Sequence, residues 1–579
     1  MVWDAAAKVN GVSLNSVLLS GPDLTASLLG VLLRFRQKRI AITGDIKEMF
    51  HQVMVKPEDQ HAQRFLWRGK NINSEPAEYI MRVMTFGSTC SPSCAQFVKN
   101  QNAFGYRESF PKACHAIVKN HYVDDWLQSF DTEADAIAVA SDVKNVNATA
   151  GFLIRNWRSN SSAVLQALGE EVMKESSINL NLEQKDEKIL GMWWDCKGDA
   201  FTYSLKYNKG NQKILQGEQR PTKRELLRIL MSIYDPLGLI THFLVFLKVL
   251  LQDTWRRKTD WDDEIENDQY KLFTSWLQLL PRIEKLKIPR CYIYEFDNYL
   301  GAEIEMHTFV DASADACAAA SYLRVKKHGK IKCILVAAKS HVAPLKLMSI
   351  PNLEAEAALL GARLAHSVDA HIEVKPSRCI FWSDSSTVLS WIQSSNLRRL
   401  GKFAAFRIAE IQEITNSSEW RYVPSAHNVA DDATKWTKPP KLDSSDRWFV
   451  GPSFLNQPES DWPAQKYTSS NVECEEEIVA IHKTTEAILD VKDFSTWRKL
   501  RKTIALMFNY RRRILKNTIQ KIVLPSDYLK AEKWLYRLAQ GDVFSREINA
   551  LRHSDDLKKI AVIRKSPPLF LLIWTRMMS

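Results

Sequence analysis

Long apolar runs are absent from this 579-residue sequence. No stretch approaches the roughly 20 apolar residues that a transmembrane helix needs, and the run at residues 569–574 is far shorter. The first four residues contain neither the basic region nor the apolar stretch of a secretory signal. We therefore expect an intracellular protein, cytoplasmic or nuclear, that is not secreted and does not bind a membrane.

Cysteine is scarce and irregularly placed. The nine cysteines form no regular disulfide framework, which suits a reduced compartment. Cys90 and Cys94 lack the CxxC spacing of a zinc site, and no nearby histidine completes one, so both are interpreted as small packed residues. Internal repeats and low-complexity tracts are missing too, which excludes a repeat architecture.

The composition is that of several ordinary globular domains. Hydrophobic residues make up 45% of the chain and charged residues 25%, and 579 residues exceed what one core usually organises. The net charge of +12 and the pI of about 9.1 suit a polyanionic partner, although excess lysine and arginine can also simply keep a surface soluble. The 18 tryptophans could stack on bases, but most are expected to fill cores.

Two adjacent carboxylates lie inside an aromatic and apolar stretch. Residues 121–126 read His-Tyr-Val-Asp-Asp-Trp, which places Asp124 and Asp125 side by side on a predicted tight hairpin. Like charges at contact range repel, and partial burial strengthens the repulsion. A pair of divalent metal ions relieves it, and such pairs drive phosphoryl transfer in polymerases and nucleases. Alone, the two aspartates also fit a solvated turn.

A third carboxylate upstream favours the metal site. The run at residues 41–45 predicts a strand that ends at Asp45, after which the pattern turns helical. Together with Asp124 and Asp125, Asp45 supplies the hard oxygen ligands that Mg²⁺ prefers. Phe50 follows five residues later and could lie under the sugar of an incoming nucleotide, where it would exclude a 2′-hydroxyl. A core aromatic is the alternative interpretation of Phe50.

Motifs follow one another in a definite order. They include Gly-Asp-Ile-Lys at 44–47, Phe-Gly at 86–87 with Ser-Pro at 91–92, Tyr-Val-Asp-Asp at 122–125 and Leu-Gly-Met-Trp-Trp-Asp at 190–195. In these motifs the sequence resembles the reverse transcriptase and ribonuclease H region of a BEL/Pao-type LTR retrotransposon Pol polyprotein. The resemblance implies that Asp45, Asp124 and Asp125 are catalytic and hold two Mg²⁺ ions, with Mn²⁺ as an alternative. The residues implied to contact the template and nucleotide are Phe50, Phe86, Gly87, Ser91, Pro92 and Tyr122.

A second set of carboxylates lies at the ends of predicted elements. The patterns predict strands at 306–309, 317–325, 332–337, 379–382 and 420–423, and helices at 352–365 and 428–433. This order is typical of a ribonuclease H fold, in which four carboxylates would converge and hold two Mg²⁺ ions. The four candidates are Asp311, Glu354, Asp384 and Asp431. Three nearby residues leave alternatives open: Asp432 beside Asp431, Glu356 beside Glu354, and His427, which we interpret as a loop residue.

The section between the two carboxylate sets is predicted to be helical. Thr222 and Glu225 have capping-box spacing, residues 235–238 predict a turn, and a second amphipathic run continues to residue 255. The resemblance implies a thumb and connection here. Five basic residues could contact phosphates or form a solvated face: Lys223, Arg224, Arg256, Arg257 and Lys258.

We expect a multidomain chain of α+β and α/β class. A palm-type polymerase with incomplete fingers, palm and thumb/connection would be followed by a ribonuclease H-like domain and a mostly helical C-terminal tether. The expected boundaries are 1–205 for partial fingers and palm, 206–300 for thumb and connection, 301–440 for the ribonuclease H-like domain, and 441–579 for a tether toward a missing integrase. Because the family's basic fingers residues and integrase motifs are not seen, we expect a fragment truncated at both ends.

The resemblance implies an RNA-directed DNA polymerase with ribonuclease H activity on RNA–DNA hybrids. Its partners would be an RNA template, a DNA primer, the hybrid and deoxynucleoside triphosphates, and its oligomeric state does not follow from the sequence. One alternative is a catalytically inactive remnant that binds nucleic acid, which the expected truncation favours. Another is an aspartic peptidase of the Pao type, but residues 311–313 lack the Asp-Thr/Ser-Gly turn that such a dyad needs.

Overall fold

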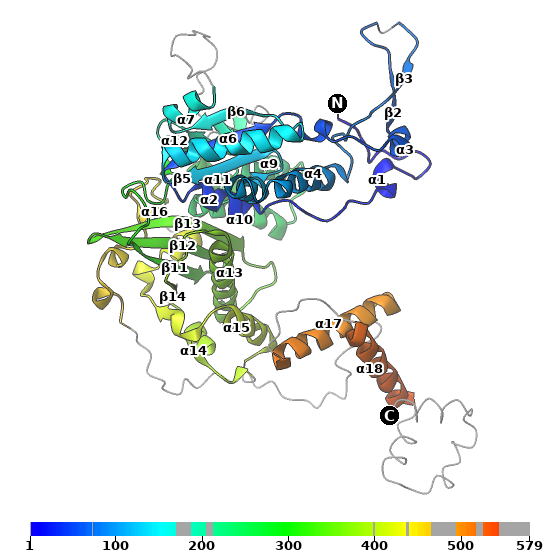
Figure 1. Ribbon diagram of the computed structural model, residues 1–579. Coiled ribbons are helices and arrows are strands. Elements are labelled where there is room, and N and C mark those ends of the chain that lie inside the picture. The colour runs from blue at the N-terminus through cyan, green and yellow to red at the C-terminus, as the bar shows by residue number, and fades with distance from the viewer. Residues whose placement is uncertain are drawn as a thin grey trace, which may run out of the picture. The chain divides into compact units, whose positions relative to one another are not determined.

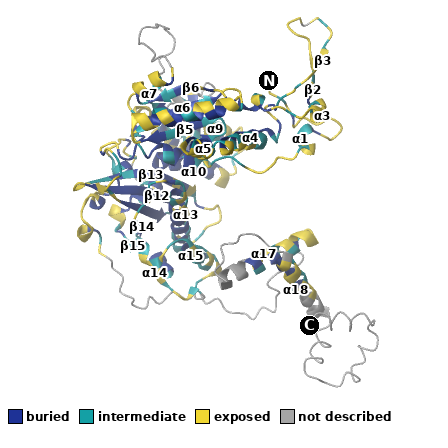
Figure 2. Ribbon diagram, in the orientation of Figure 1, coloured by how far each residue is buried: buried dark blue, intermediate teal, exposed yellow. Residues whose placement is uncertain are grey.

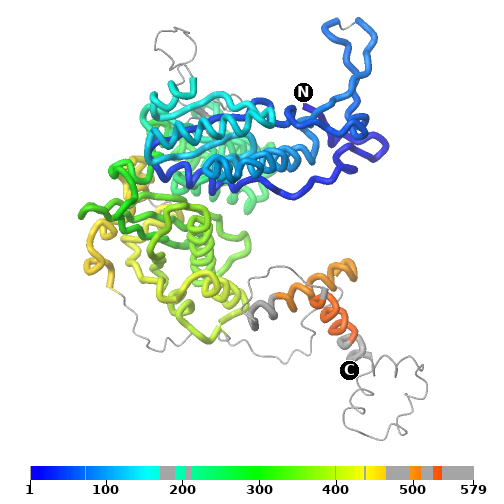
Figure 3. Tube along the Cα trace, viewed as in Figure 1, coloured from blue at the N-terminus to red at the C-terminus, as the bar shows by residue number. Residues whose placement is uncertain are grey.

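The computed structural model divides the chain into two units. Residues 1–475 form one compact unit and residues 476–579 form the other. The course of the chain in each can be followed in Figures 1 and 3. No described helix combines the length and the apolar character that crossing a bilayer takes. The structure describes residues 2–71, 73–169, 187–203, 212–397, 400–435, 439–464, 494–516 and 525–543.

A four-stranded antiparallel sheet, in the order β4-β5-β1-β6, organises the N-terminal region. Its strands are β1 (Ile40–Ile46), β4 (His121–Tyr122), β5 (Asp125–Phe130) and β6 (Ile154–Ser159). Side chains alternate along a strand, so Ile42 and Trp126 enter one apolar core while Ala41 and Leu127 enter another. The helices that pack here are α2 (Leu28–Phe35), α4 (Ser91–Gly105), α5 (Pro111–Lys119) and α6 (Glu133–Thr149).

These helices cover opposite faces of the sheet. Apolar residues of α4, α5 and α6 share the core of Ile42, and α4 and α6 lie side by side in Figures 1 and 3. Residues of α2 instead join the core of Ala41. The smaller elements nearby are α1 (Leu14–Val17), the 3₁₀ helices η1 (Met49–Gln52) and η2 (His61–Gln63), α3 (Pro57–Gln60), β2 (Arg64–Trp67), β3 (Ala77–Ile80) and α7 (Ser162–Ala167).

A second sheet and a helical section follow. The sheet, in the order β10-β9-β8-β7, contains β7 (Glu187–Ile189), β8 (Met192–Asp195), β9 (Ala200–Thr202) and β10 (Ile288–Pro289). The helices are α8 (Gln212–Leu215), α9 (Lys223–Ser232), α10 (Thr241–Arg256), α11 (Asn267–Leu277) and α12 (Leu280–Lys285). The predicted capping box is confirmed, because Thr222 accepts from the Glu225 amide and Glu225 accepts from the Thr222 amide at 2.8 Å.

The predicted turn at residues 235–238 joins α9 to α10. The carboxylate of Asp235 accepts hydrogen bonds from the Leu239 and Ile240 amides at 2.9 and 2.8 Å. Gly238 has a φ of +71°, and a Cβ there would lie 1.8 Å from the carbonyl oxygen of Ala338. Only glycine therefore allows this turn to lie against the strand that contains Ala338.

The ribonuclease H-like order of elements is confirmed. The sheet order is β13-β12-β11-β14-β15, with β11, β12 and β13 antiparallel and β14 and β15 added in parallel. Figure 2 shows these strands as largely buried. The elements are β11 (Glu303–Ala312), β12 (Ala316–Lys327), β13 (Lys330–Val342), α13 (Ile350–His371), β14 (Arg378–Ser383), α14 (Ser386–Gln393), α15 (Lys402–Ile414), η4 (Ser417–Glu419), β15 (Trp420–Tyr422), η5 (Ser425–His427) and η6 (Val429–Ala433).

Residues beyond 440 complete this domain's core. Trp448 and Leu455 are fully buried, the Tyr322 hydroxyl donates to the Trp448 carbonyl at 2.7 Å, and Arg324 donates to the Leu455 carbonyl at 2.7 Å. Trp462 is buried as well, so residues of the expected tether as far as Trp462 pack with the ribonuclease H-like sheet. The segment contains α16 (Arg447–Val450), η7 (Ser453–Asn456) and η8 (Glu459–Asp461).

The second unit contains a pair of helices, α17 (Trp497–Lys516) and α18 (Pro525–Val543). They share a small apolar core. The rest of the expected tether, residues 465–493, 517–524 and 544–579, lies outside the described residues. The core residues are Leu500, Ile504, Ala505, Ala531 and Leu535.

Two fully buried arginines join the first sheet to the ribonuclease H-like sheet. Arg36, just after α2, donates to the carbonyls of Leu335 and Val336 in β13 at 3.1 Å each, and to that of Arg290 at 3.1 Å. Arg290 donates in return to the carbonyls of Phe35, Lys38 and Arg39 at 2.5–2.9 Å, and to both carboxylate oxygens of Asp199. Each guanidinium thus satisfies backbone carbonyls that burial would otherwise leave unpaired.

Replacing Arg36 with methionine should therefore destabilise the first unit strongly. The substitution leaves buried carbonyls without donors, and we expect the free energy of unfolding to fall by on the order of 3–5 kcal/mol. Urea unfolding followed by tryptophan fluorescence measures the loss. The matched control is Arg39→Met, whose exposed ion pair with Asp297 should be worth less than about 1 kcal/mol. Equal losses in the two variants would contradict this role of Arg36.

Candidate functional site

The register of the first sheet brings three acidic residues to one end. Asp45 of β1 lies directly opposite Asp125 of β5 in the antiparallel pair. Asp124 precedes Asp125, and its carbonyl accepts from the Ile46 amide at 2.9 Å. The sequence-predicted set Asp45, Asp124 and Asp125 is thus brought together. We refer to it as the first carboxylate centre.

The hairpin that contains these aspartates has an unusual backbone. Val123 has a φ of +58°, a left-handed conformation that a β-branched residue rarely adopts. Its carbonyl accepts from the side-chain amide of Gln96, in α4, at 2.9 Å. On the other side of the turn, Tyr122 pairs with Asp125. Helix α4 therefore holds the hairpin in a conformation that the local sequence alone disfavours.

The first carboxylate centre is electrostatically strained. Burial, followed by the charges of Asp124 and Asp45, raises the pKa of Asp125 to about 6. Burial also raises the pKa of Asp124, partly offset by Arg155 and by Lys99. Asp45 accepts from the side chains of Arg155 at 3.1 Å and Asn156 at 2.6 Å. A proton or a cation would relieve this repulsion.

Lys99 was not anticipated from the sequence. It is 1% exposed, lies one helical turn after Gln96 in α4, and has its pKa lowered to about 7 by burial, which Asp124 partly offsets. A lone lysine in an amphipathic helix gives no sequence signal of such a position. Lys99 thus supplies an internal positive charge near Asp124.

Five of the six residues predicted to contact the template and nucleotide, all except Tyr122, lie on two neighbouring segments. The rings of Phe50 and Phe86 have centroids 4.7 Å apart, and Phe50 is 9% exposed. Gly87 has a φ of +105°, and a Cβ there would lie 1.9 Å from the Trp3 carbonyl oxygen, so only glycine fits. Ser91 is buried and its hydroxyl donates to the Thr85 carbonyl at 2.7 Å, while Pro92 lies in the first turn of α4.

The parallel pairing of β11 and β14 brings a second group of acids together. Val310 pairs with Ser383. Asp311, near the end of β11, and Asp384, just after β14, therefore lie at the same end of two adjacent strands. Asn428 bridges them by donating to the Val310 carbonyl at 3.0 Å and to Asp384 at 3.2 Å. We name Asp311, Glu354, Asp384 and Asp431 the second carboxylate centre.

The predicted acids and the acids next to them in sequence make different contacts. Glu354 accepts from the Ser385 hydroxyl, whereas Glu356 is paired with Arg407. The charge of Asp431 acts on Asp311, whereas Asp432 accepts two hydrogen bonds from Arg447 at 2.8 and 2.5 Å. The geometry therefore favours Glu354 and Asp431 as members of the centre. His427 lies against Phe454, with ring centroids 6.1 Å apart.

Electrostatic strain is also evident in the second carboxylate centre. Burial raises the pKa of Asp311 to about 7, with contributions from the charges of Asp384 and Asp431, although a hydrogen bond from Thr434 opposes the rise. Burial also raises the pKa of Glu354. Lys435 pairs with Asp431, and although burial disfavours its charge, that bond and the charge of Asp311 raise its pKa overall. The centre thus contains its own cation.

The acids of both centres have the donor chemistry that suits a divalent cation, but they are not arranged around one. Among the described residues, no three His, Cys, Asp or Glu side chains lie in a group that could hold a metal ion. Instead, neighbouring donors hold the carboxylates, for example Asn156 on Asp45 and Thr434 on Asp311. The acids of both centres offer only carboxylate oxygens, which Mg²⁺ prefers, and a bound cation would relieve the repulsion within each group.

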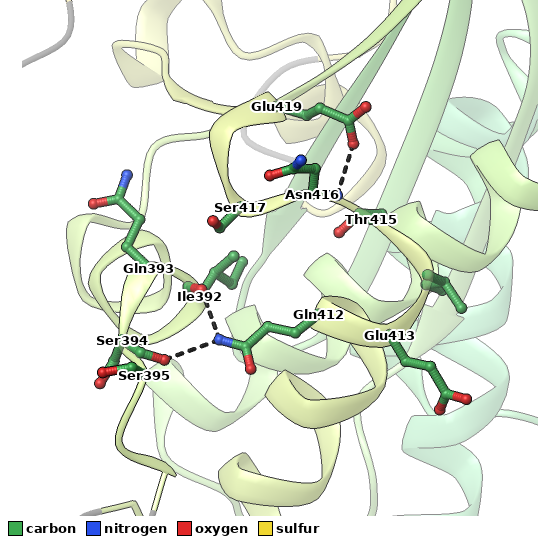
Figure 4. Close-up of a pocket in the computed structure, with 11 residues that line it drawn as sticks. Ile392, Gln393, Ser394, Ser395, Gln412, Glu413, Thr415, Asn416, Ser417 and Glu419 are labelled. Atoms are coloured by element: carbon green, nitrogen blue, oxygen red, sulfur yellow. Dashed lines mark hydrogen bonds between the residues drawn. The ribbon is translucent and has the colours of Figure 1, made fainter. Parts of the chain in front are cut away.

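Two cavities lie away from these acids. One, of about 650 Å³, lies between the ends of α14 and α15. Gln412 borders it and donates to the carbonyls of Ile392 and Ser394 at 2.8 and 3.0 Å, hydrogen bonds that Figure 4 marks with dashed lines. A second cavity, of about 550 Å³, lies beside Arg34, Lys119 and His371. None of the predicted site residues lines either cavity.

Four of the five basic residues between the centres are engaged within the protein. Lys223 lies over the Trp255 ring at 3.5 Å, and Arg224 pairs with Asp262 at 2.7 Å. Arg256 pairs with Asp315 at 3.9 Å, and Arg257 pairs with Asp253, Glu266 and Asp268 at 2.6–2.8 Å. These contacts favour structural roles for the four over phosphate binding.

Two family models match separate parts of this chain. Residues 8–191 match the family model of the reverse transcriptase (RNA-dependent DNA polymerase), and residues 222–385 match that of the Pao retrotransposon-like RNaseH-like domain. The chain joins a reverse transcriptase domain to a Pao-type ribonuclease H-like domain. This pairing confirms the resemblance to the Pol region of a BEL/Pao element and the expected multidomain fold class.

Solved structures of a foamy viral protease–reverse transcriptase are similar to this reverse transcriptase–ribonuclease H chain. One complex with double-stranded DNA has 13% identity and a TM-score of 0.44 over 76% of this chain and 63% of that one. A complex with an RNA/DNA hybrid has 14% identity and a TM-score of 0.42 over 72% and 48%, respectively. The chain thus spans less than two thirds of either. Curated proteins include no match to it.

The raised pKa of Asp311 predicts how stability depends on pH. The folded protein holds this proton up to about pH 7, whereas an unfolded chain releases it near pH 4, so the metal-free protein should lose stability as the pH rises between these values. Asp311→Asn removes that loss and should be more stable than the parent at about pH 8, by on the order of 1–3 kcal/mol, with little difference at about pH 4. Thermal unfolding in EDTA measures both. A parallel decline in the two proteins would contradict the prediction.

Proposed function

We propose that this chain is an RNA-directed DNA polymerase with ribonuclease H activity on RNA–DNA hybrids. The observation that carries the proposal is the convergence of two separate carboxylate groups, one on the β1–β5 pair and one at the ends of β11 and β14. Reverse transcriptase and ribonuclease H-like domains generally use divalent metal ions. We propose two Mg²⁺ ions at each centre, where they would lower the pKa of the attacking group and stabilise the leaving oxygen.

In the polymerase reaction, Asp45, Asp124 and Asp125 would supply the metal ligands beside the primer end. Gln96 would keep the strained hairpin in place through its 2.9 Å bond to Val123, so that the aspartates need not reorganise. The face of Phe50 would lie against the sugar of the incoming deoxynucleoside triphosphate. Its contact with Phe86 limits the movement that would admit a 2′-hydroxyl.

In the nuclease reaction, the second carboxylate centre would cleave the RNA strand of the hybrid. Asn428 orients Asp384, and Ser385 orients Glu354, so both carboxylates have fixed positions before substrate binds. The hybrid would be recognised by shape and by its 2′-hydroxyls rather than by base sequence.

The alternative is a protein that binds nucleic acid without catalysis. The contacts of Asp45 with Arg155 and Asn156, and of Asp431 with Lys435, favour it, because these donors already satisfy carboxylates that metal ions would need. The two functions differ in whether metal displaces those donors.

Reciprocal substitutions should separate the two activities. Asp124→Asn should lower Mg²⁺-dependent primer extension on an RNA template by on the order of 100-fold while hybrid cleavage continues, because only the first centre loses a ligand. Asp311→Asn should do the opposite. Extension and cleavage are measured on the same purified proteins with and without Mg²⁺. Equal extension by the parent and Asp124→Asn would remove the polymerase proposal.

Substitutions of the two adjacent aspartates of η6, Asp431 and Asp432, should have different effects, one on hybrid cleavage and the other on stability. Asp431→Asn is expected to lower hybrid cleavage by on the order of 100-fold through loss of a metal ligand. Asp432→Asn should leave cleavage within about tenfold and instead lower the free energy of unfolding by about 1–2 kcal/mol, because Arg447 loses a charged acceptor. Cleavage rates and urea unfolding of both variants test this assignment, and it is wrong if Asp432→Asn is the inactive one.

A further inference from the structure

Helix α17 is strongly basic. Its 20-residue sequence contains eight lysines and arginines and no acidic residue. In the part whose side chains are described, Arg498, Lys499 and Lys502 are exposed, while Arg501 pairs with Glu532 of α18 at 2.6 Å. We call the exposed three the basic face of α17.

The three cations lie on the side of α17 away from its apolar seam. At 100° per residue, Leu500 and Ile504 point toward α18, and the positions of Arg498, Lys499 and Lys502 cluster on the opposite side. Lys502 is four residues from Arg498 and three from Lys499, spacings at which like charges are neighbours and weaken a helix. The arrangement costs helix stability unless an anion neutralises it.

Helix α18 has no comparable charge. Between Pro525 and Tyr536 its two lysines, Lys530 and Lys533, are balanced by two acids, Asp527 and Glu532. Positive charge in the described helix pair is therefore concentrated on α17. An excess of one sign of charge on a surface favours a partner of the opposite charge.

An exposed aromatic pair lies at the start of α17, where Trp497 directly precedes Arg498. At 100° per residue, Trp497 falls on the α18 side of the helix, so it borders the basic face only at Arg498. Trp497 is 49% exposed and Tyr536 is 51% exposed, and their ring centroids are 6.0 Å apart. Large exposed aromatics beside cations are the combination with which proteins bind single-stranded nucleic acid, because bases stack on the rings while phosphates meet the cations.

We propose that the basic face of α17, with Trp497, binds the phosphate backbone of single-stranded RNA. This binding is separate from both carboxylate centres and needs no metal ion. It rests on the proposed function only in the choice of RNA as the polyanion. The helix pair would then add an attachment point for the template outside the two reaction centres.

The test is the salt dependence of RNA binding by the full chain. A short fluorescein-labelled single-stranded RNA is titrated in EDTA, which stops metal-dependent chemistry, between about 50 and 200 mM KCl. Each phosphate contact contributes about 0.7 to the slope of log K against log salt, so the double variant Lys499→Gln/Lys502→Gln should reduce the slope by about 1.4. Over this range the parent should lose about sevenfold more affinity than the variant.

Matched variants decide the outcome. Lys530→Gln/Lys533→Gln removes two lysines at the same spacing from α18 and should keep the parent slope. Lys499→Arg/Lys502→Arg keeps the charge and should also keep it, whereas Trp497→Ala should weaken binding about fivefold or more with the slope unchanged. The proposal is overturned if the two glutamine doubles behave alike, if the arginine double also loses the slope, or if only binding to phosphatidylserine vesicles depends on Lys499 and Lys502.

Failure here is distinguishable from failure of the proposed function. Asp124→Asn and Asp311→Asn should bind the RNA with the parent slope, because neither centre contributes to this surface. A chain that binds RNA through α17 but neither extends primers nor cleaves hybrids would support this inference and remove the enzymatic proposal.

Discussion

The exchange of carbonyl hydrogen bonds by Arg36 and Arg290 is the interaction on which the first unit depends. Arg36 reaches from the end of α2 to β13, and Arg290 reaches back from the end of β10 to the residues that follow α2. Both side chains are fully buried, so each would be costly without its acceptors. Apart from the carboxylate of Asp199, the acceptors are backbone atoms, so the bonds fix the positions of main-chain segments relative to each other rather than those of two side chains.

The most predictable parts of the structure are those set by local pattern. The capping box at Thr222 and Glu225, the strand leading to Asp311 and the helix bearing Glu354 follow from residue periodicity and capping chemistry, which act over a few residues. The grouping of Asp45 with Asp124 was predicted from the strand that ends at Asp45 and from the need of adjacent carboxylates for a cation. The register of β1 with β5 supplies the geometry.

The features that the sequence did not reveal depend on contacts between residues that are far apart in the chain. Lys99 and Lys435 are ordinary basic residues until folding places one near Asp124 and the other against Asp431. Residues 441–464 were expected to belong to a tether, yet Trp448 and Leu455 are buried in the apolar core of the ribonuclease H-like domain. Their carbonyls accept hydrogen bonds from Tyr322 and Arg324, more than 100 residues earlier. Periodicity carries no information on such pairs. The choice between Asp431 and Asp432 was open for the same reason, since it turns on the position of Arg447.

Each carboxylate centre contains repulsion between like charges, and each has a lysine that offsets it in a different way. In the first, Lys99 is buried near Asp124 and its pKa is lowered to about 7, so near neutral pH only part of a positive charge offsets the repulsion. In the second, Lys435 is half-exposed and bonded to a proposed ligand, so it can leave when a cation arrives. The two centres are nevertheless connected by packing. Residues of α2 and the sheet face that contains Ala41 and Leu127 share a continuous apolar core with the ribonuclease H-like sheet. A close-packed core transmits displacement rather than absorbing it. The separation between the centres is therefore set by packing, and movement of one centre relative to the other would require that shared core to break.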